Sequence, residues 1–422
     1  MAYDMVGYFD TYDYWRGGNR WSCLFCGLEL IMKNNTAQQN IPSGWKQVSL
    51  GDLVSVTTGS RDANHGSPDG QYPFFTCAQK VSKINEFSFD TEAVLIAGNG
   101  DFNVKYYKGK FDAYQRTYVL SDFKNTTGHF VYQKAKQALN DIMRNNQGSS
   151  VKFIKMGDLT DYEFIFPPIK EQQKIAEILG TVDEDIAKTQ ELIEATEKLK
   201  RGLMQQLFTR GIGHTKFKET KMGQIPEEWE VLELGKVCDV RDGTHSSPKY
   251  HEEGIPLITS KNLVDTILDF ENVSLISEID FQEIERRSKV DGGDILFGMI
   301  GTIGNPVIVR KDRDFAIKNV ALIKFTDSKM NNAFVLNFLK STHTEKQFNQ
   351  KKGGSTQKFI ALGVIRQILI TVPSVTEQKK IAEILSAVDE KTSVNKKLKE
   401  KLTFLKKGLM QDLLSGNKRV KV

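Results

Sequence analysis

The chain has 422 residues, of which 39% are hydrophobic and 26% are charged, and its formal net charge is +5. This length allows two or three domains with full cores, and the small positive charge permits a polyanionic partner without requiring one. No apolar run reaches the length of a membrane span and no signal peptide is evident, so we expect a cytoplasmic protein without a membrane partner.

Residues 1–40 have no counterpart later in the sequence, and we treat them as an N-terminal extension whose role the sequence does not define. Cys23 and Cys26 within it have the spacing of half a zinc site. No second Cys or His pair follows at ligand spacing, so two free thiols are the better interpretation. Four cysteines in all also argue against a disulfide framework. We therefore predict no metal site.

Residues 41–168 have the pattern of a mixed α+β domain with a curved sheet. Short runs rich in strand formers alternate with clusters of Gly, Asn and Asp, and a helical pattern covers 130–144. The predicted strands are Val54–Thr58, Tyr72–Thr76, Ala93–Ala97 and Thr117–Leu120.

One long helix is predicted over residues 169–210, directly after Pro167 and Pro168. The 38 residues from Glu171 to Phe208 would form a rod of roughly 57 Å. Apolar residues at steps of four and three mark a seam with charged flanks, which is typical of a helix paired along its length with another. A core helix in an ordinary domain is the alternative, and the unusual length disfavours it.

The rest of the chain repeats this plan: a polar linker at 211–224, a second domain at 225–373, a second long helix at 374–416 and a basic tail at 417–422. The helix motif returns without a gap at an offset of 206 residues, from Ile175 to Ile381, which indicates duplication. We expect the two helices to pack antiparallel. The residues predicted to pair them are Ile175, Leu179, Val182, Ile186, Leu199 and Leu203 in the first helix, and Ile381, Leu385, Val388, Leu398, Leu402, Leu405 and Leu409 in the second.

The second domain echoes the first at its edges and diverges in its middle. Ile225-Pro-Glu-Glu-Trp229 repeats the pattern of Ile41-Pro-Ser-Gly-Trp45, and His245-Ser-Ser-Pro248 that of His65-Gly-Ser-Pro68. Predicted strands follow at Pro256–Thr259, Asp294–Gly298, Pro306–Val309 and Asn319–Phe325, with a helical pattern at 332–350.

Enzyme signatures are missing from both halves. We find no phosphate-binding Gly-x-x-x-x-Gly-Lys-Ser/Thr loop, no spaced glycine triplet for a dinucleotide and no Asn-Pro-Pro-Tyr/Phe. A nuclease-like pairing of Asp69 with Asp122 and Lys124 has no equivalent in the second half. We therefore predict no catalytic or cofactor-binding residues in this chain.

Polar loops between the predicted strands carry the side chains that read base edges in DNA. Any single such loop is more often a solvated turn, but recurrence in two diverging domains favours recognition. The candidates in the first domain are Arg61, Asn64, His65, Gln79, Lys80, Asn99, Asn103, Gln115 and Arg116. Those in the second are Arg241, Thr244, His245, Ser246, Lys249, Tyr250, Ser260, Lys261, Asn262, Thr302, Lys318 and Asn319.

The order of these parts, with EQQKIAEIL…LKRGLMQQLF in one helix and EQKKIAEIL…LKKGLMQDLL in the other, resembles the specificity subunit of type I restriction–modification systems from about Ile41 to the C-terminus. The resemblance implies an α+β architecture of two pseudo-symmetric mixed α/β target-recognition domains, separated by two long antiparallel coiled-coil-like helices. Each domain would read one half of a bipartite site in double-stranded DNA. The helices would set the spacing and dock two methyltransferase subunits.

The same resemblance implies a non-catalytic chain without its own cofactor. S-adenosylmethionine would be bound by the methyltransferase subunits, and ATP with magnesium by restriction or translocase subunits. Two alternatives remain: a self-contained restriction or methylation enzyme with a built-in recognition half, and a structural coiled-coil protein whose loops bind no DNA.

Overall fold

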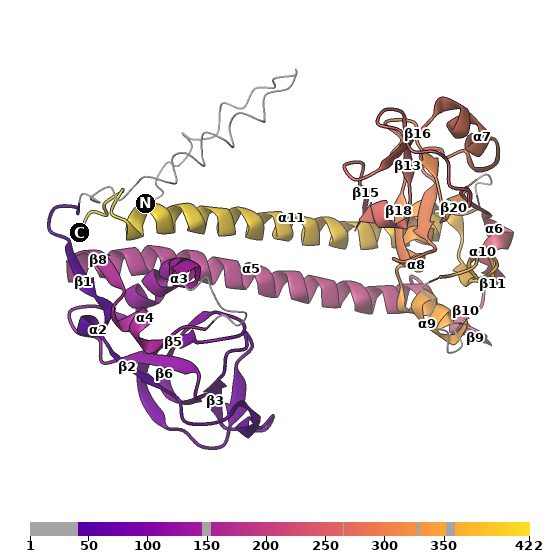
Figure 1. Ribbon diagram of the computed structural model, residues 1–422. Coiled ribbons are helices and arrows are strands. Elements are labelled where there is room, and N and C mark those ends of the chain that lie inside the picture. The colour runs from indigo at the N-terminus through magenta and orange to yellow at the C-terminus, as the bar shows by residue number, and fades with distance from the viewer. Residues whose placement is uncertain (1–40, 146–152, 265, 326–328, 352–358) are drawn as a thin grey trace. The chain divides into compact units, whose positions relative to one another are not determined.

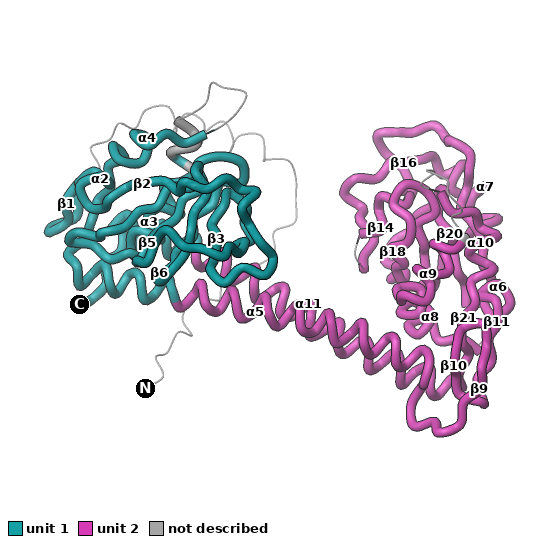
Figure 2. The backbone as a smooth tube through the Cα atoms, turned by 90° about the horizontal axis from the view of Figure 1, so that it is seen from below, with its two compact units in different colours: residues 1–180, 407–422 teal, residues 181–406 magenta. Residues whose placement is uncertain are grey.

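The computed structural model describes residues 41–145, 153–264, 266–325, 329–351 and 359–422 (Figure 1). The predicted N-terminal extension, including Cys23 and Cys26, lies outside the described residues. The chain divides into two compact units, residues 1–180 with 407–422 and residues 181–406 (Figure 2). Each unit combines one mixed domain with segments of both long helices.

The first unit is built on a six-stranded sheet in the order β2-β7-β5-β6-β3-β4, in which only β3 and β6 run parallel. Helix α3 (Gly128–Asn145) packs against β5 and β6. Beside the sheet, β1 (Lys46–Ser49) pairs with β8 (Glu163–Phe166). The strands of the large sheet are β2 (Ser55–Thr58), β3 (Tyr72–Phe75), β4 (Ser82–Ile84), β5 (Phe89–Ala97), β6 (Val104–Ala113) and β7 (Thr117–Ser121). The short helices are α2 (Leu50–Leu53), η1 (Ala63–His65) and α4 (Met156–Thr160).

The second unit repeats this topology. Its four-stranded sheet has the order β12-β20-β17-β18, which corresponds to β2-β7-β5-β6, and a parallel pairing of β13 with β19 corresponds to that of β3 with β6. The strands of its two larger sheets are β12 (Asp239–Asp242), β13 (Ile255–Ile258), β16 (Ser274–Ile276), β17 (Ile295–Gly298), β18 (Gly304–Ile308), β19 (Ala316–Ile317) and β20 (Val320–Lys324). The predicted repeat of a mixed α+β domain is therefore confirmed.

Smaller elements complete the second unit. Three further pairs of strands are β9 (Phe217–Thr220) with β10 (Gly223–Pro226), β11 (Glu230–Glu233) with β21 (Leu369–Val372), and β14 (Leu263–Val264) with β15 (Ile267–Leu268). Its short helices are α6 (Leu234–Val237), η2 (Ser260–Asn262), α7 (Glu278–Ser288), α8 (Asn332–Leu339), α9 (Thr342–Lys351) and α10 (Leu362–Arg366). The helix predicted at 332–350 is thus two helices, which meet at Lys340 and Ser341.

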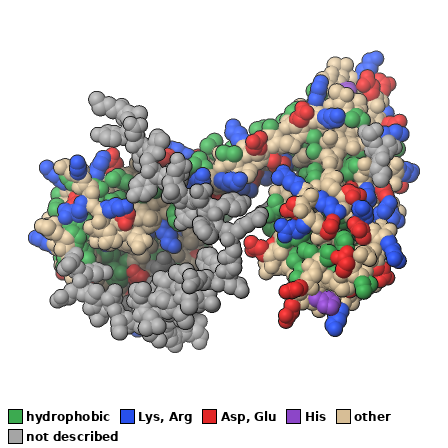
Figure 3. All heavy atoms as spheres, turned by 90° about the horizontal axis from the view of Figure 1, so that it is seen from above, with side chains coloured by type: hydrophobic (Ala, Val, Ile, Leu, Met, Phe, Trp, Pro, Cys, Tyr) green, Lys and Arg blue, Asp and Glu red, His purple; other side chains and the backbone are tan. Residues whose placement is uncertain are grey.

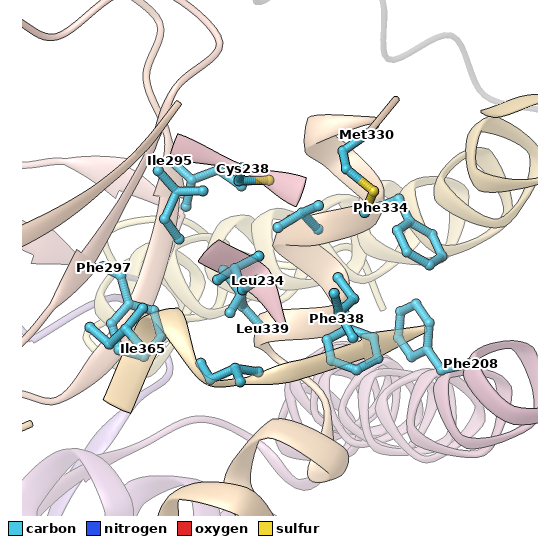
Figure 4. Packing of buried hydrophobic residues seen from close by; sticks show 14 of the residues in the cluster. Phe208, Leu234, Cys238, Ile295, Phe297, Met330, Phe334, Phe338, Leu339 and Ile365 are labelled. Carbon is cyan, nitrogen blue, oxygen red and sulfur yellow. The ribbon is translucent and has the colours of Figure 1, made fainter. Parts of the chain in front are cut away.

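Both long helices exist, as α5 (Ile169–Arg210) and α11 (Val375–Leu414). Within each unit, the segments of these helices are part of the domain core. In the second unit the Phe208 ring of α5 packs edge-on against Phe334 and Phe338 of α8, at centroid distances of 5.4 and 5.2 Å (Figure 4). In the first unit, Leu413 and Leu414 of α11 lie in one cluster with residues of the sheet.

A glutamate at the start of each long helix fastens it to its domain in the same way. Glu171, 3% exposed, accepts a hydrogen bond from Trp45 Nε1 at 3.2 Å and pairs with Arg419 at 2.7 Å. In the second unit Glu377 accepts from Trp229 Nε1 at 3.0 Å and lies 2.9 Å from His214 Nε2. The duplication therefore preserved the junction between domain and helix.

Ion pairs and hydrogen bonds between α5 and α11 in the second unit show that the helices are antiparallel. Lys200 Nζ lies 2.6 Å from Asp389, and Lys399 Nζ donates to Gln190 at 2.8 Å. Further along α11, Lys406 pairs with Asp183 of α5. Residue numbers fall along α11 as they rise along α5, so the predicted antiparallel pair is confirmed.

The predicted leucine seam is wrong in its middle. Leu199, Leu398 and Leu405 are 56%, 45% and 49% exposed. On α11, Thr392 is buried and the predicted Leu402 is partly buried. Leu398 and Leu405 each lie one position before a lysine that bonds to α5, Lys399 to Gln190 and Lys406 to Asp183, so these two leucines lie beside the seam rather than within it.

Of the predicted seam residues near the domains, Ile175 and Leu179 lie in the core cluster of the first unit, and Ile381 and Leu385 lie in that of the second. Ile175, Leu179, Ile381 and Leu385 have no more than 1% exposure, and Val182 is buried. The partly buried members are Ile186, Leu203, Val388, Leu402 and Leu409.

Lys134 in α3 is expected to make the free energy of unfolding of the first unit depend on pH in the alkaline range. Its Nζ is buried and donates to the carbonyl of Leu414, at the end of α11, at 2.5 Å. Burial lowers the pKa of Lys134 to about 8 from an ordinary 10.5. Between these values the unfolded chain retains a proton that the folded chain has lost, so the free energy of unfolding should rise with pH.

Denaturant titrations of the wild type and of Lys134→Met at several pH values measure this effect. From about pH 8 to 10.5 the wild type should gain at most about 3 kcal/mol relative to the variant, which has no titrating group there. If the free energies of unfolding of the two proteins changed with pH in parallel, burial would not lower the pKa of Lys134.

Candidate nucleic-acid interface

The four polar loops identified in the first domain meet where the curved sheet brings strand ends together. The backbone N–H of Gln115 donates to the carbonyl of Arg61 at 2.9 Å, and Gly98 N–H donates to the carbonyl of Arg116 at 2.8 Å. A Cβ on Gly98 would lie 2.7 Å from that same carbonyl oxygen, so this approach requires glycine. Three loops distant in sequence are thereby held against one another.

Side-chain bonds add the fourth loop. Cys77 Sγ donates to Asn99 Oδ1 at 2.9 Å, and Asn103 Nδ2 donates to the carbonyl of Cys77 at 2.8 Å. Lys105 Nζ reaches the carbonyl of Ala78 at 2.7 Å. The backbone on which the candidate side chains stand is therefore fixed by hydrogen bonds, as selective recognition requires.

The candidates of this cluster differ in how much of each is accessible. Arg61 pairs with Asp112 and Glu86 within the domain, and Asn103 is only 8% exposed. The candidates with exposed side chains are Asn64, His65, Gln79, Lys80, Gln115 and Arg116, and Asn99 is partly exposed. These seven remain candidates for direct DNA contact, while Asn103 serves to position the loop.

The second domain assembles its own loops around Asn319, whose backbone has a φ of 53°. Asn319 N–H donates to the carbonyl of Thr244 at 3.1 Å, and its own carbonyl accepts from Ser260 Oγ at 3.3 Å. Ser260 Oγ in turn accepts from Met299 N–H at 3.2 Å, and Lys318 Nζ donates to Ser247 Oγ at 2.7 Å. The loops after β12, β13, β17 and β19 therefore converge, as their equivalents do in the first domain.

Burial separates supporting residues from accessible ones here too. Ser260 and Asn262 are 4% and 3% exposed, and the amide of Asn262 caps its own 3₁₀ turn, so neither offers a surface to bases. Arg241 is held by Asp239 at 2.6 Å. The exposed candidates are His245, Ser246, Lys249, Tyr250, Lys261 and Thr302, and the partly exposed ones are Thr244, Lys318 and Asn319.

The two histidines that the sequence pattern aligned do not occupy equivalent places. Arg61 pairs in parallel with Tyr114, as Thr244 does with Lys318, so residues 61 and 244 correspond. His65 lies four residues beyond this point and bonds the backbone of Asp62, whereas His245 follows it directly. The similarity of the two His-x-x-Pro runs reflects a shared turn composition.

His245 is held between two oxygen acceptors. Its Nδ1 lies 2.8 Å from Asn319 Oδ1 and its Nε2 lies 2.8 Å from Asp242 Oδ2, while Arg287 pairs with the other oxygen of Asp242. Both ring nitrogens can donate only in the imidazolium form, so the bonds to Asn319 and Asp242 raise the pKa of His245. The second domain thus presents a histidine that remains cationic to higher pH than an ordinary one.

Asn319→Gly is expected to lower the pKa of His245 toward its ordinary value. Glycine adopts a positive φ freely, so the backbone of the loop should remain in place. An NMR titration of the imidazole C–H signals measures the change. Asn305→Gly, at another positive φ in the same unit, is the matched control. An unchanged titration in Asn319→Gly would refute the role of this amide.

Charges of both signs cover the second unit. On the face seen in Figure 3, Lys and Arg side chains alternate with Asp and Glu side chains rather than forming one basic field. This distribution agrees with the modest net charge of +5. Phosphate neutralisation by this face alone would be limited.

Each domain also places an exposed phenylalanine, which is not among the predicted candidates, beside its recognition loops. Phe153 and Phe359 are 44% and 45% exposed, and each forms a β-bridge to a loop of the recognition cluster, at Asn99 and Ile300 respectively. They are related by the same offset of 206 residues as the helices. The repeated Lys-Phe-Ile sequence was the available signal.

The residues that the structure describes contain no group of three or more His, Cys, Asp or Glu side chains arranged to hold a metal ion. Within the same residues, every helix is too short or too polar to cross a membrane.

Comparison with known proteins gives consistent results. The profile of a family described as type I restriction modification DNA specificity domain matches residues 42–197 and 226–403. The chain is 35% identical over 233 residues to the type I restriction enzyme EcoDI specificity subunit of Escherichia coli, a match that covers 50% of this chain and 52% of that protein. It is 27% identical over 408 residues to the MjaVIII specificity subunit of Methanocaldococcus jannaschii, covering 90% of this chain and 94% of that one.

Among solved structures, a type I restriction–modification S subunit from M. genitalium superimposes with a TM-score of 0.61 at 18% identity, covering 90% of this chain and 97% of that one. A second solved structure, which concerns complex assembly and conformational transition of the type I R-M system, superimposes with a TM-score of 0.53 at 14% identity. The match covers 90% of this chain and 99% of that one. At these identities the superpositions support the fold alone.

Proposed function

Because this chain belongs to the family of type I restriction–modification DNA specificity proteins, we propose that each of its two domains reads one half of a bipartite site in double-stranded DNA. The observation that carries the proposal is the repeated convergence of four polar loops on the same sheet topology in both units. A constant scaffold with different loop side chains suits two readers of different sequence.

The exposed leucines of the long helices support docking of two copies of one partner. Leu192 and Leu199 on α5 recur as Leu398 and Leu405 on α11, and all four are between 45% and 56% exposed. A residue pattern repeated on the outside of both helices offers the same apolar contact twice. The proposed partners are two methyltransferase subunits, and restriction or translocase subunits would join them.

The chemistry would then belong to the partners. S-adenosylmethionine would be bound by the methyltransferase subunits, and ATP with magnesium by the restriction or translocase subunits, while this chain supplies recognition without catalysis. The assembly would work in the cytoplasm, where cellular DNA is accessible. The docking of the methyltransferase subunits is supported by the repeated leucine surface, and the other assignments rest on family membership.

The helix pair would act as a spacer between the two readers. The ion pairs Lys200–Asp389 and Lys406–Asp183 are related by the offset of 206 residues, so the duplication produced the same interhelical ion pair twice. Charged pairs at defined positions fix the register of paired helices. A fixed register in turn fixes the length of the spacer.

Footprinting with the purified complex tests the proposed function. The chain with its methyltransferase should protect two half-sites separated by a constant gap, and the chain alone should bind weakly at physiological salt. Absence of a bipartite footprint would contradict the proposal. Incubating the chain alone with DNA, magnesium and S-adenosylmethionine is the complementary test, since cleavage or methyl transfer would identify a self-contained enzyme.

A further inference from the structure

Each domain holds its exposed phenylalanine by the same backbone arrangement. In the first unit, Ile154 N–H donates to the carbonyl of Gly98 at 2.8 Å, and Ile154 is 3% exposed. In the second unit, Ile360 N–H donates to the carbonyl of Met299 at 2.9 Å, and Ile360 is 4% exposed. The isoleucine fixes the segment to the core, and the phenylalanine before it is directed to the opposite side, as alternation along extended backbone requires.

The surroundings of the two rings differ, although the rings themselves do not. Phe153 is bridged to the polar residue Asn99, with Lys155 Nζ 5.8 Å from the ring centroid. Phe359 is bridged to Ile300, which is 40% exposed. A side chain kept constant where neighbouring loops have diverged serves a contact that does not depend on the sequence being read.

Aromatic stacking on a DNA base has this property, because every base has a π-face. A ring can also enter a base step as an apolar wedge, which is favoured where a base has been turned out of the duplex. We infer that Phe153 and Phe359 stack on a base in the half-site read by their own domain. The inference rests on the proposed function, since the rings adjoin the loops assigned to base recognition.

Phe153→Ala and Phe359→Ala should each weaken binding of the assembled complex to its bipartite site about tenfold or more. Tryptophan at either position should retain the affinity, whereas leucine, which is apolar but cannot stack, should behave like alanine. Phe217→Ala in the β9–β10 hairpin, where the ring is 37% exposed, is the matched control and should bind as the wild type does.

The measurement is a titration of the methyltransferase complex with duplexes that carry 2-aminopurine at successive positions of each half-site. Phe153→Ala should change the fluorescence of bound DNA only in one half-site and Phe359→Ala only in the other. Native mass spectrometry verifies that each variant still carries its methyltransferase subunits.

The outcomes separate the two proposals. If the wild-type complex binds no bipartite site, the proposed function fails and this inference fails with it. If the wild type binds and the alanine variants bind equally well, only this inference is overturned. Full recovery of affinity by leucine would also overturn it, because a non-stacking apolar contact, such as one with the methyltransferase, would then be sufficient.

Discussion

Replacing Leu199 and Leu405 with glutamate is expected to abolish docking of both methyltransferase subunits while the chain stays folded. Both side chains are about half exposed, so their exchange removes little internal packing. In the complex, each glutamate would place a charge in an apolar contact without a partner, which costs several kcal/mol at a buried interface. Modification of cellular DNA should be lost with the complex.

Single variants make this prediction sharper. Leu199→Glu alone should leave one methyltransferase copy bound through α11, and Leu405→Glu alone should leave one bound through α5. Native mass spectrometry reports the copy number directly. Ile279→Glu on α7, at a side chain that is 79% exposed, is the control. Two bound copies in the double variant would show that docking uses another surface.

Lengthening both long helices by one heptad is expected to widen the gap between half-sites and preserve the sequence of each half. Seven residues inserted after Gln190 in α5 and seven after Leu398 in α11 lie at facing levels, because Gln190 contacts Lys399. The seam keeps its three-and-four spacing. The added length of about 10 Å corresponds to about three base pairs.

Methylation mapping of DNA from cells with the lengthened protein measures the new gap. Seven residues inserted between Glu252 and Glu253, in an exposed loop, provide the control and should leave the gap unchanged. If the helix insertion also leaves the gap unchanged, the helices do not set the spacing.

Most of the fold could be predicted because each sequence pattern that is weak by itself occurs in both halves of the chain. The long helices followed from their length and from the repeated motif. The seam was partly misplaced because the leucine pattern of Leu398 and Leu405 was assigned to internal packing, whereas the next residues along α11, Lys399 and Lys406, bond to side chains of α5. Apolar periodicity does not distinguish a side chain buried within the chain from one available to a second protein.

The longest strand of the first sheet was missed for a related reason. β6 contains three lysines and Gly109, whose φ is 130°, and such a composition predicts a loop. The strand forms because β5 and β3 pair with it on both sides. Tertiary pairing here outweighs local preference.

The candidate site was predictable as a set of loops, but not in its details. Polar composition identified the loops that converge. It did not reveal that Ser260 and Asn262 are buried supports, since a hydroxyl or amide that braces a loop has the same sequence signature as one that reads a base. The exposed Phe153 and Phe359 went unrecognised because their role depends on strand ends that only the fold brings beside them.

The two dissimilar readers are expected to share one duplex at a fixed separation. Sequencing the methylated bases in DNA from cells that carry the complete system tests this most directly. We predict one bipartite motif, with a methylated base in each half and a spacer of constant length. A single continuous motif, or two halves with a variable spacer, would contradict the account.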